Sequence, residues 1–121
     1  MKTILVADDR PFIRHSIRQM LDANPAYQVL EAADGAEALA QARQHRPDLV
    51  LLDVEMPELS GYEVCAALRA DPGTRSLPIL LMSAASGDVQ GYALQAGGDG
   101  FFEKPFAADA LLAKLKELLR E

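Results

Sequence analysis

Short apolar runs alternate along the chain with longer stretches of amphipathic character. Five of the runs have the length of β-strands, and they cover residues 3–7, 28–32, 48–52, 78–82 and 100–103. The first, third and fourth runs lack the polar alternation of a half-exposed strand, which is typical of strands buried on both faces of a parallel sheet. Such a sheet needs helices on both of its faces.

The stretches between the runs carry the spacing and the capping residues of helices. Apolar residues recur at helical spacing in residues 13–21 and 111–119, as they do on the buried face of a helix. Asp34 precedes Glu37, and Ser60 precedes Glu63, at the spacing that lets side chains satisfy the backbone amides of a helix start. A further helix is expected at about residues 89–96, where Gly91 makes it the softest of the set.

The alternation of strands and helices predicts an α/β fold with a doubly wound, flavodoxin-like sheet. We expect five parallel strands in the order 2-1-3-4-5, right-handed crossovers and five flanking helices. A length of 121 residues suits one compact domain over residues 1–121. A second domain has no room.

Polar side chains stand where the predicted strands end. They are Asp8 and Asp9 at the end of the first strand, Asp53 at the end of the third, Ser83 at the end of the fourth and Lys104 after the fifth. In a parallel α/β sheet, functional residues gather beyond the carboxyl ends of the strands. We therefore expect all five side chains at one edge of the sheet.

If the first and third strands are adjacent, Asp8, Asp9 and Asp53 form a tight carboxylate cluster. Their repulsion is relieved when one carboxyl stays protonated or when a hard divalent cation binds. One lysine among three acids favours the cation, and Mg²⁺ suits the site because it leaves positions for phosphoryl oxygens. Asp53 can then act as a nucleophile and form an aspartyl phosphate, with Lys104 stabilising charge on the phosphoryl oxygens and Ser83 hydrogen-bonding one of them.

Charge and cysteine content narrow the partners and the compartment. The net charge of -6 and the pI near 4.8 argue against direct binding to nucleic acid and favour small cations and basic protein surfaces. With Cys65 as the one cysteine, no intramolecular disulfide forms, so a reducing cytoplasm is the expected location. The first apolar run ends at Asp8, far short of the roughly 20 residues of a membrane span, and we expect no membrane contact.

Several short motifs occur together in a recognisable order. The chain resembles the receiver domains of response regulators, the phosphoacceptor modules of two-component phosphorelay signalling, and the resemblance runs from end to end. The motifs that carry it are Asp8-Asp9, Leu51-Leu52-Asp53-Val54-Glu55-Met56-Pro57 followed by Gly61, Ser83-Ala84, and Lys104-Pro105-Phe106.

The resemblance implies a role for each matching residue. Asp53 would be the phosphoacceptor, and the Mg²⁺ ligands would be Asp9, Asp53 and the backbone carbonyl of Glu55, with Asp8 acting through metal-bound water. Lys104 would clamp the phosphoryl group. Ser83 and Phe101 would be the switch residues, Ser83 moving toward the phosphoryl group and Phe101 turning inward.

The resemblance also implies the partners. A sensor histidine kinase or a histidine phosphotransfer protein would donate the phosphoryl group, and the surface of the fourth helix, fifth strand and fifth helix would act on a downstream effector. Phosphorylation-dependent dimerisation is compatible with this scheme. The domain would assist only its own phosphorylation and dephosphorylation, and would not be an enzyme with an external substrate.

A few residues depart from the commonest receiver pattern or carry two interpretations. Phe101 replaces a frequent tyrosine, and Glu55 adds an acid two residues after Asp53. Arg10 follows the acidic pair, and we hypothesise that it pairs with Glu55 across the site. Arg14 and Arg18 lie one turn apart, which fits either a solvated helix face or, by the resemblance, an edge that docks a kinase.

Three other functions compete with the receiver interpretation. A haloacid-dehalogenase-like phosphatase also forms an aspartyl phosphate, but Glu55 stands where its acid/base aspartate belongs, and Asp8-Asp9 would be unexplained. A nucleotide or flavin module would need a glycine-rich phosphate loop in place of the acidic one. A receiver that docks proteins without phosphorylation remains open.

Overall fold

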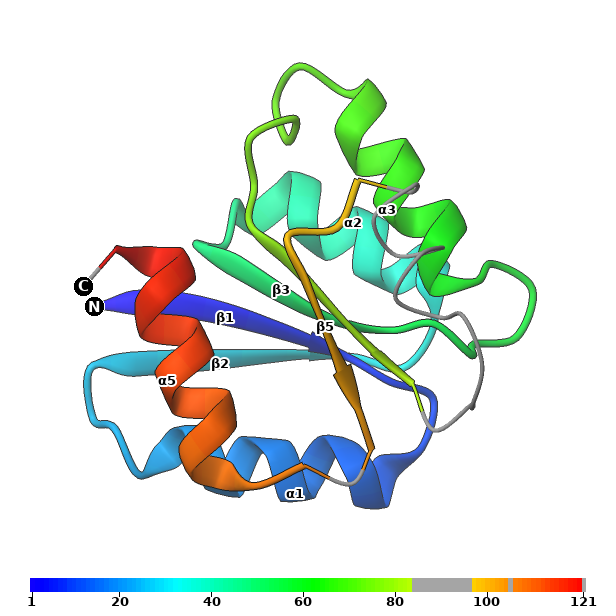
Figure 1. The fold of residues 1–121 in the computed structure, drawn as a ribbon. Helices are drawn as coiled ribbons and strands as arrows, with labels where there is room; N and C mark the ends of the chain where they lie inside the picture. The colour runs from blue at the N-terminus through cyan, green and yellow to red at the C-terminus, as the bar shows by residue number, and fades with distance from the viewer. Residues whose placement is uncertain (84–96, 105, 121) are drawn as a thin grey trace.

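A five-stranded parallel sheet forms the centre of the molecule (Figure 1). The computed structural model describes residues 1–83, 97–104 and 106–120. The strands are β1 (Lys2–Ala7), β2 (Tyr27–Ala32), β3 (Leu49–Asp53), β4 (Ile79–Ser83) and β5 (Gly100–Glu103). Their order is β2-β1-β3-β4-β5, and every neighbouring pair is parallel. The flavodoxin-like topology predicted from the sequence is thereby confirmed.

Asp53 and Ser83 are the last residues of their strands, as predicted, and each lies one residue beyond the apolar run that marked the strand. Strand β3 extends through Asp53, which pairs in register with Met82, and strand β4 extends through Ser83, which pairs with Glu103. The ladder continues one residue past β3, because the Val54 amide donates to the Met82 carbonyl at 2.9 Å. Asp53 and Ser83 are therefore held by the sheet itself.

Helices cover both faces of the sheet, as the buried strands require. Helices α1 (Pro11–Asp22) and α5 (Ala108–Leu119) lie on one face, and α2 (Gly35–His45) and α3 (Gly61–Ala70) lie on the other (Figure 1). The helix expected at residues 89–96 lies outside the described residues. None of the helices in the described ranges has the length and apolar content needed to cross a membrane.

Each face of the sheet has its own hydrophobic core. On one face Ile17 and Leu21 of α1 and Leu111 and Leu115 of α5 pack against β1, β3 and β4. On the other, the small residues of α2 and the apolar side of α3, including Cys65, pack against the opposite side of the same strands. The buried leucines and isoleucines fix the strand positions, since each fully buried side chain contributes about 1.5–3 kcal/mol.

The helix that follows the acidic strand is fixed tightly against it. Ser60 and Glu63 form the predicted capping box at the start of α3, with distances of 3.3 and 3.1 Å. The Gly61 amide donates to the Val54 carbonyl at 3.1 Å. A Cβ at Gly61 would overlap the backbone carbonyl of Asp53, so only glycine allows this approach. The position of Asp53 therefore depends on α3 as well as on the sheet.

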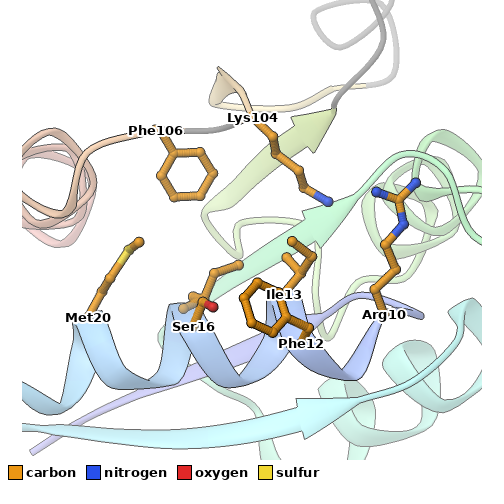
Figure 2. Close-up of a pocket in the computed structure, with 8 residues that line it drawn as sticks. Arg10, Phe12, Ile13, Ser16, Met20, Lys104 and Phe106 are labelled. Atoms are coloured by element: carbon orange, nitrogen blue, oxygen red, sulfur yellow. The ribbon is translucent and has the colours of Figure 1, made fainter.

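An apolar pocket of about 370 Å³ borders the carboxyl edge of the sheet. Met20 of α1 and Phe106 lie at one end of it, and Arg10 and Lys104 lie at the other (Figure 2). Phe12 lines the pocket and is 77% exposed, which is high for a large apolar side chain. The pocket thus joins an exposed apolar surface to the residues at the strand ends.

Candidate functional site

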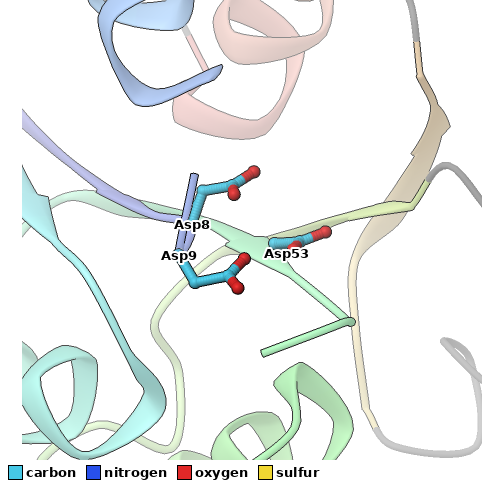
Figure 3. A group of neighbouring side chains, drawn as sticks. All are labelled: Asp8, Asp9 and Asp53. Carbon is cyan, nitrogen blue, oxygen red and sulfur yellow. The ribbon is translucent and has the colours of Figure 1, made fainter. Parts of the chain in front are cut away.

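Three carboxylates meet where β1 and β3 end. Asp8 and Asp9 follow β1, Asp53 ends β3, and one oxygen from each lies within 4.8 Å of the others. Figure 3 shows the three side chains together at this edge of the sheet. Asp8 and Asp53 are buried, and Asp9 is partly exposed. Adjacency of β1 and β3 produces the cluster, as the predicted strand order implied.

Lys104 follows the edge strand β5, and its side chain extends to this cluster. Its Nζ lies 2.6 Å from Asp8 Oδ2 and 3.0 Å from Asp53 Oδ1, and the side chain is 8% exposed. The residue follows β5, whose last residue pairs with Ser83, and the Lys104 amide donates to the Ser83 carbonyl at 2.8 Å. The structure therefore brings Asp8, Asp9, Asp53 and Lys104 together as the sequence predicted.

The charges in the cluster do not balance. Three aspartates face one ammonium group, which leaves two negative charges when every carboxyl is ionised. Asp9 Oδ1 and Asp53 Oδ2 are buried and make no hydrogen bond within the described residues. Buried oxygens without donors are costly unless something else neutralises them. Closely spaced carboxylate oxygens with free lone pairs are suitable ligands for a hard divalent cation such as Mg²⁺.

The surroundings of Asp53 raise the pKa of its carboxyl group above the usual value. Burial is the main cause, and the neighbouring Asp8 charge adds to it, so that together they raise the pKa of Asp53 from 3.8 to about 6. Hydrogen bonding and charge attraction from Lys104 and a hydrogen bond from the Glu55 backbone act in the opposite direction. Asp53 is thus mainly ionised at neutral pH, although the carboxylate is 1% exposed.

Ser83 lies at the same edge and is hydrogen-bonded to Glu55, which we had expected to pair with Arg10. It is fully buried, and its Oγ donates to Glu55 Oε1 at 2.9 Å. The hypothesis of an Arg10–Glu55 pair is wrong, because no ion pair among the described residues joins them. Arg10 instead donates its backbone amide to Asp8 Oδ1 at 2.9 Å, which closes the turn after β1.

Phe101 lies in β5, in register with Leu81, and is partly buried against the core that includes Ala7 and Leu52. Its side chain therefore packs on the face of the sheet that α2 and α3 cover. The movement expected of Phe101 stays a prediction, as does the part expected of the Glu55 carbonyl.

Arg14 has a positioning role that the sequence did not reveal. Its Nη1 donates to the backbone carbonyl of Asp8 at 2.7 Å, and its Nε lies 3.3 Å from Glu31 Oε1. Arg18 contacts the other Glu31 oxygen at 2.5 Å. The hydrogen bond from Arg18, followed by that from Arg14, lowers the pKa of Glu31 against the opposing effect of burial. Both arginines are thus paired with a carboxylate of β2, and the docking role of this helix edge stays a prediction.

A sequence signal for this role exists only in retrospect. Arg14 is 17% exposed and Arg18 is 43% exposed, although their spacing on the helix suggested equal exposure. The partner carboxylate, Glu31, lies in the second predicted strand, which pairs with β1 in the confirmed topology. Glu31, the one acid of this edge strand, was the available hint.

Comparison with known proteins gives one consistent result at the level of sequence. The family model described as "Response regulator receiver domain" matches residues 4–116. The response regulator MprA of Mycobacterium sp. (strain KMS) is 46% identical over 118 residues, which cover 97% of this chain and 50% of MprA. MprA of Mycobacterium avium (strain 104) is 45% identical with the same coverage. The chain spans about half the length of these curated relatives.

Solved structures agree with the sequence comparison. The chemotaxis protein CheY4 of Vibrio cholerae is 33% identical, with a TM-score of 0.89 and 98% of each chain covered. The receiver domain of the sensor histidine kinase PA1611 from Pseudomonas aeruginosa PAO1 is 32% identical, with a TM-score of 0.89, covering 99% of this chain and 98% of that one. The PA1611 structure has a magnesium ion coordinated in its active site cleft.

The raised pKa of Asp53 predicts how stability depends on pH without metal. Between about pH 4 and about pH 7 the folded protein binds more protons than the unfolded chain, so the free energy of unfolding falls as the pH rises. The decline should be on the order of 2 kcal/mol, and Asp53→Asn should lack it. Urea unfolding of both proteins with a chelator, across this range, measures the difference. A difference that does not change with pH would contradict the prediction.

The Arg14 contact predicts a second, metal-dependent effect. Arg14→Gln removes a donor to the Asp8 carbonyl, so the turn carrying Asp8 and Asp9 is less fixed and Mg²⁺ affinity should fall about tenfold. Arg18→Gln is the matched control, since it also loses a contact to Glu31 but leaves the Asp8 carbonyl bonded. Amide chemical shifts during Mg²⁺ titration measure both affinities. Equal affinities in the two variants would exclude the positioning role.

Proposed function

The chain belongs to the response regulator receiver domain family, and from this premise we propose that it is a phosphorylation-dependent signalling switch whose Asp53 accepts the phosphoryl group. The observation that carries the proposal is the arrangement of Asp53 itself. Its carboxylate is buried at a strand end, bonded through one oxygen to Lys104 and free of hydrogen bonds at the other within the described residues. A nucleophile with a fixed cation beside it fits phosphoryl transfer.

The transfer step needs an ionised acceptor and a donor with a labile phosphorus bond. With a pKa of about 6, Asp53 is mainly a carboxylate at neutral pH. An Asp53 oxygen attacks the phosphorus of a phosphohistidine, the oxygen–phosphorus bond forms as the phosphorus–nitrogen bond breaks, and the imidazole leaves. Lys104 Nζ, 3.0 Å from Asp53 Oδ1, is placed to stabilise charge on the phosphoryl oxygens.

The acidic cluster is the proposed holder of Mg²⁺. Asp9 and Asp53 would hold the ion directly with the Glu55 backbone carbonyl, and Asp8 would act through water. The orphaned oxygens Asp9 Oδ1 and Asp53 Oδ2 support this assignment, as does the magnesium ion in the related PA1611 receiver domain. When bound, the ion neutralises negative charge that collects on the transferring phosphoryl group.

The remaining roles follow from the position of the site in the sheet. Ser83 and Phe101 lie on β4 and β5 and are the proposed switch residues, so phosphorylation would shift a pre-existing equilibrium at the β5–α5 surface. The donor would be a sensor histidine kinase or a histidine phosphotransfer protein, and an effector protein or domain would bind the altered surface. The apolar pocket lined by Phe12 adjoins Lys104, which suits a partner that brings its histidine to this edge.

The scheme describes a signalling domain acting in the cytoplasm, with no turnover of an external substrate. The phosphatase alternative is not favoured by the family match. Glu55, which would have to replace its acid/base aspartate, has its carboxylate bonded to Ser83. A phosphorylation-independent docking domain would have no use for Lys104 held between two buried carboxylates.

Phosphorylation by a small donor tests the proposal directly. Incubation with acetyl phosphate and Mg²⁺ should add the mass of one phosphoryl group to the wild-type chain, and a chelator should abolish the gain. Asp53→Asn should gain nothing, whereas Asp109→Asn, which changes an exposed aspartate at the start of α5, should be labelled normally. Intact-mass spectrometry reads all four samples. Absence of labelling in the wild type, or equal labelling of Asp53→Asn, would refute the assignment.

A further inference from the structure

We propose that Glu55 is a positioning residue that latches Ser83 in the unphosphorylated protein. The inference rests on the proposed function, because it concerns how the Ser83 hydroxyl becomes available to a phosphoryl group on Asp53. The carboxylate of Glu55 accepts the Ser83 hydroxyl at 2.9 Å. We infer that this hydrogen bond must break before Ser83 can donate to the phosphoryl group.

The backbone geometry makes the two acceptors close competitors. Ser83 is one residue beyond Met82, the register partner of Asp53 in the neighbouring strand. Glu55 is two residues beyond Asp53, on the segment that leaves β3. The Ser83 hydroxyl is fully buried, so it is held at the strand end within reach of groups from this edge. Both the existing acceptor and the proposed one therefore come from the same short segment.

Hydrogen-bond chemistry makes the two contacts mutually exclusive. A serine hydroxyl has one proton, which it donates to one acceptor at a time. In the unphosphorylated protein that acceptor is Glu55, and donation to an ionised carboxylate gives a stronger bond than donation to a neutral group. Each phosphorylation event therefore has to exchange one anionic acceptor for another.

The latch sets a threshold for activation. In one state Ser83 donates to the phosphoryl group, and in the resting state Ser83 donates to Glu55. Breaking the Ser83–Glu55 hydrogen bond therefore offsets part of the free energy gained by binding the phosphoryl group. Negative charge on the phosphoryl group also repels the Glu55 carboxylate, which favours release once phosphorylation has occurred. Removing the latch should therefore make the active state easier to reach.

A simpler electrostatic role for Glu55 makes a different prediction. If the carboxylate only repels anionic phosphoryl donors, its charge matters and its bond to Ser83 does not. Glu55→Gln separates the two cases, because glutamine keeps a side-chain oxygen that accepts a hydrogen bond and loses the charge. Glu55→Ala loses both. Glu58→Gln removes a nearby acid that has no hydrogen bond to Ser83 within the described residues, and is the matched charge control.

The test is a titration with beryllofluoride and Mg²⁺, a phosphoryl mimic, followed by amide chemical shifts. Glu55→Ala should bind the mimic about tenfold more tightly than the wild type, in line with the loss of a competing charged hydrogen bond. Glu55→Gln should fall between the wild type and Glu55→Ala, because its neutral oxygen keeps a weaker hydrogen bond to Ser83. Glu58→Gln should stay close to the wild type. In a Ser83→Ala background, Glu55→Ala should have no further effect, since the hydroxyl that Glu55 restrains is gone.

Each other outcome has a defined meaning. Equal tightening in Glu55→Ala and Glu55→Gln would replace the latch with charge repulsion. A Glu55→Ala effect that persists in the Ser83→Ala background, or no effect in a wild-type background that binds the mimic, would overturn the latch alone. A wild-type protein that neither binds beryllofluoride nor gains a phosphoryl group from acetyl phosphate would overturn the proposed function and the latch together.

Discussion

The excess of negative charge in a partly buried carboxylate cluster is the constraint on which the rest of the structure depends. Asp8 and Asp53 bind the ammonium group of Lys104 at the carboxyl edge of the sheet, and Asp9 lies beside them. Such a cluster is unfavourable by itself, since buried carboxylates repel one another and lose their hydration. Its persistence requires a rigid scaffold, and its excess negative charge is the basis of the proposed Mg²⁺ site.

The scaffold holds the cluster from several directions. The parallel register of β1 and β3 brings the acids together, and the pairing of β4 with β5 delivers Lys104 from across the sheet. Gly61 allows α3 to begin directly against the Asp53 backbone. Arg14 holds the carbonyl of Asp8 from α1. Hydrophobic packing on both faces of the sheet offsets the unfavourable free energy of burying these carboxylates.

Much of this arrangement could be predicted from the sequence, because it depends on backbone topology. Buried strands, helix caps and the strand order place Asp8, Asp9, Asp53 and Lys104 at one edge without any knowledge of rotamers. The apolar runs alone stop one residue short of the ends of β3 and β4, since a polar side chain gives no sign that the ladder continues through it. Strand ends depend on the partner strand more than on local sequence.

Side-chain partners were harder to predict, because they depend on three-dimensional choices among similar groups. Glu55 had two plausible partners near the site, and it bonds Ser83 and not Arg10. Arg14 and Arg18 look alike along the helix, yet only Arg14 reaches the Asp8 carbonyl. Both contacts join residues of different elements. Spacing along one element carries no information about such contacts.

The measurement that tests the charge imbalance most directly is the Mg²⁺ affinity of Lys104→Met. Lys104 competes with the ion for the oxygens of Asp8 and Asp53, so removing its ammonium should increase Mg²⁺ affinity at about pH 8, where Asp53 is ionised. Lys114→Met, which removes a lysine paired with Glu117 on α5, should leave the affinity unchanged. If Lys104→Met binds Mg²⁺ no more tightly than the wild type in calorimetric titration, the cluster is not the unbalanced cation site described above.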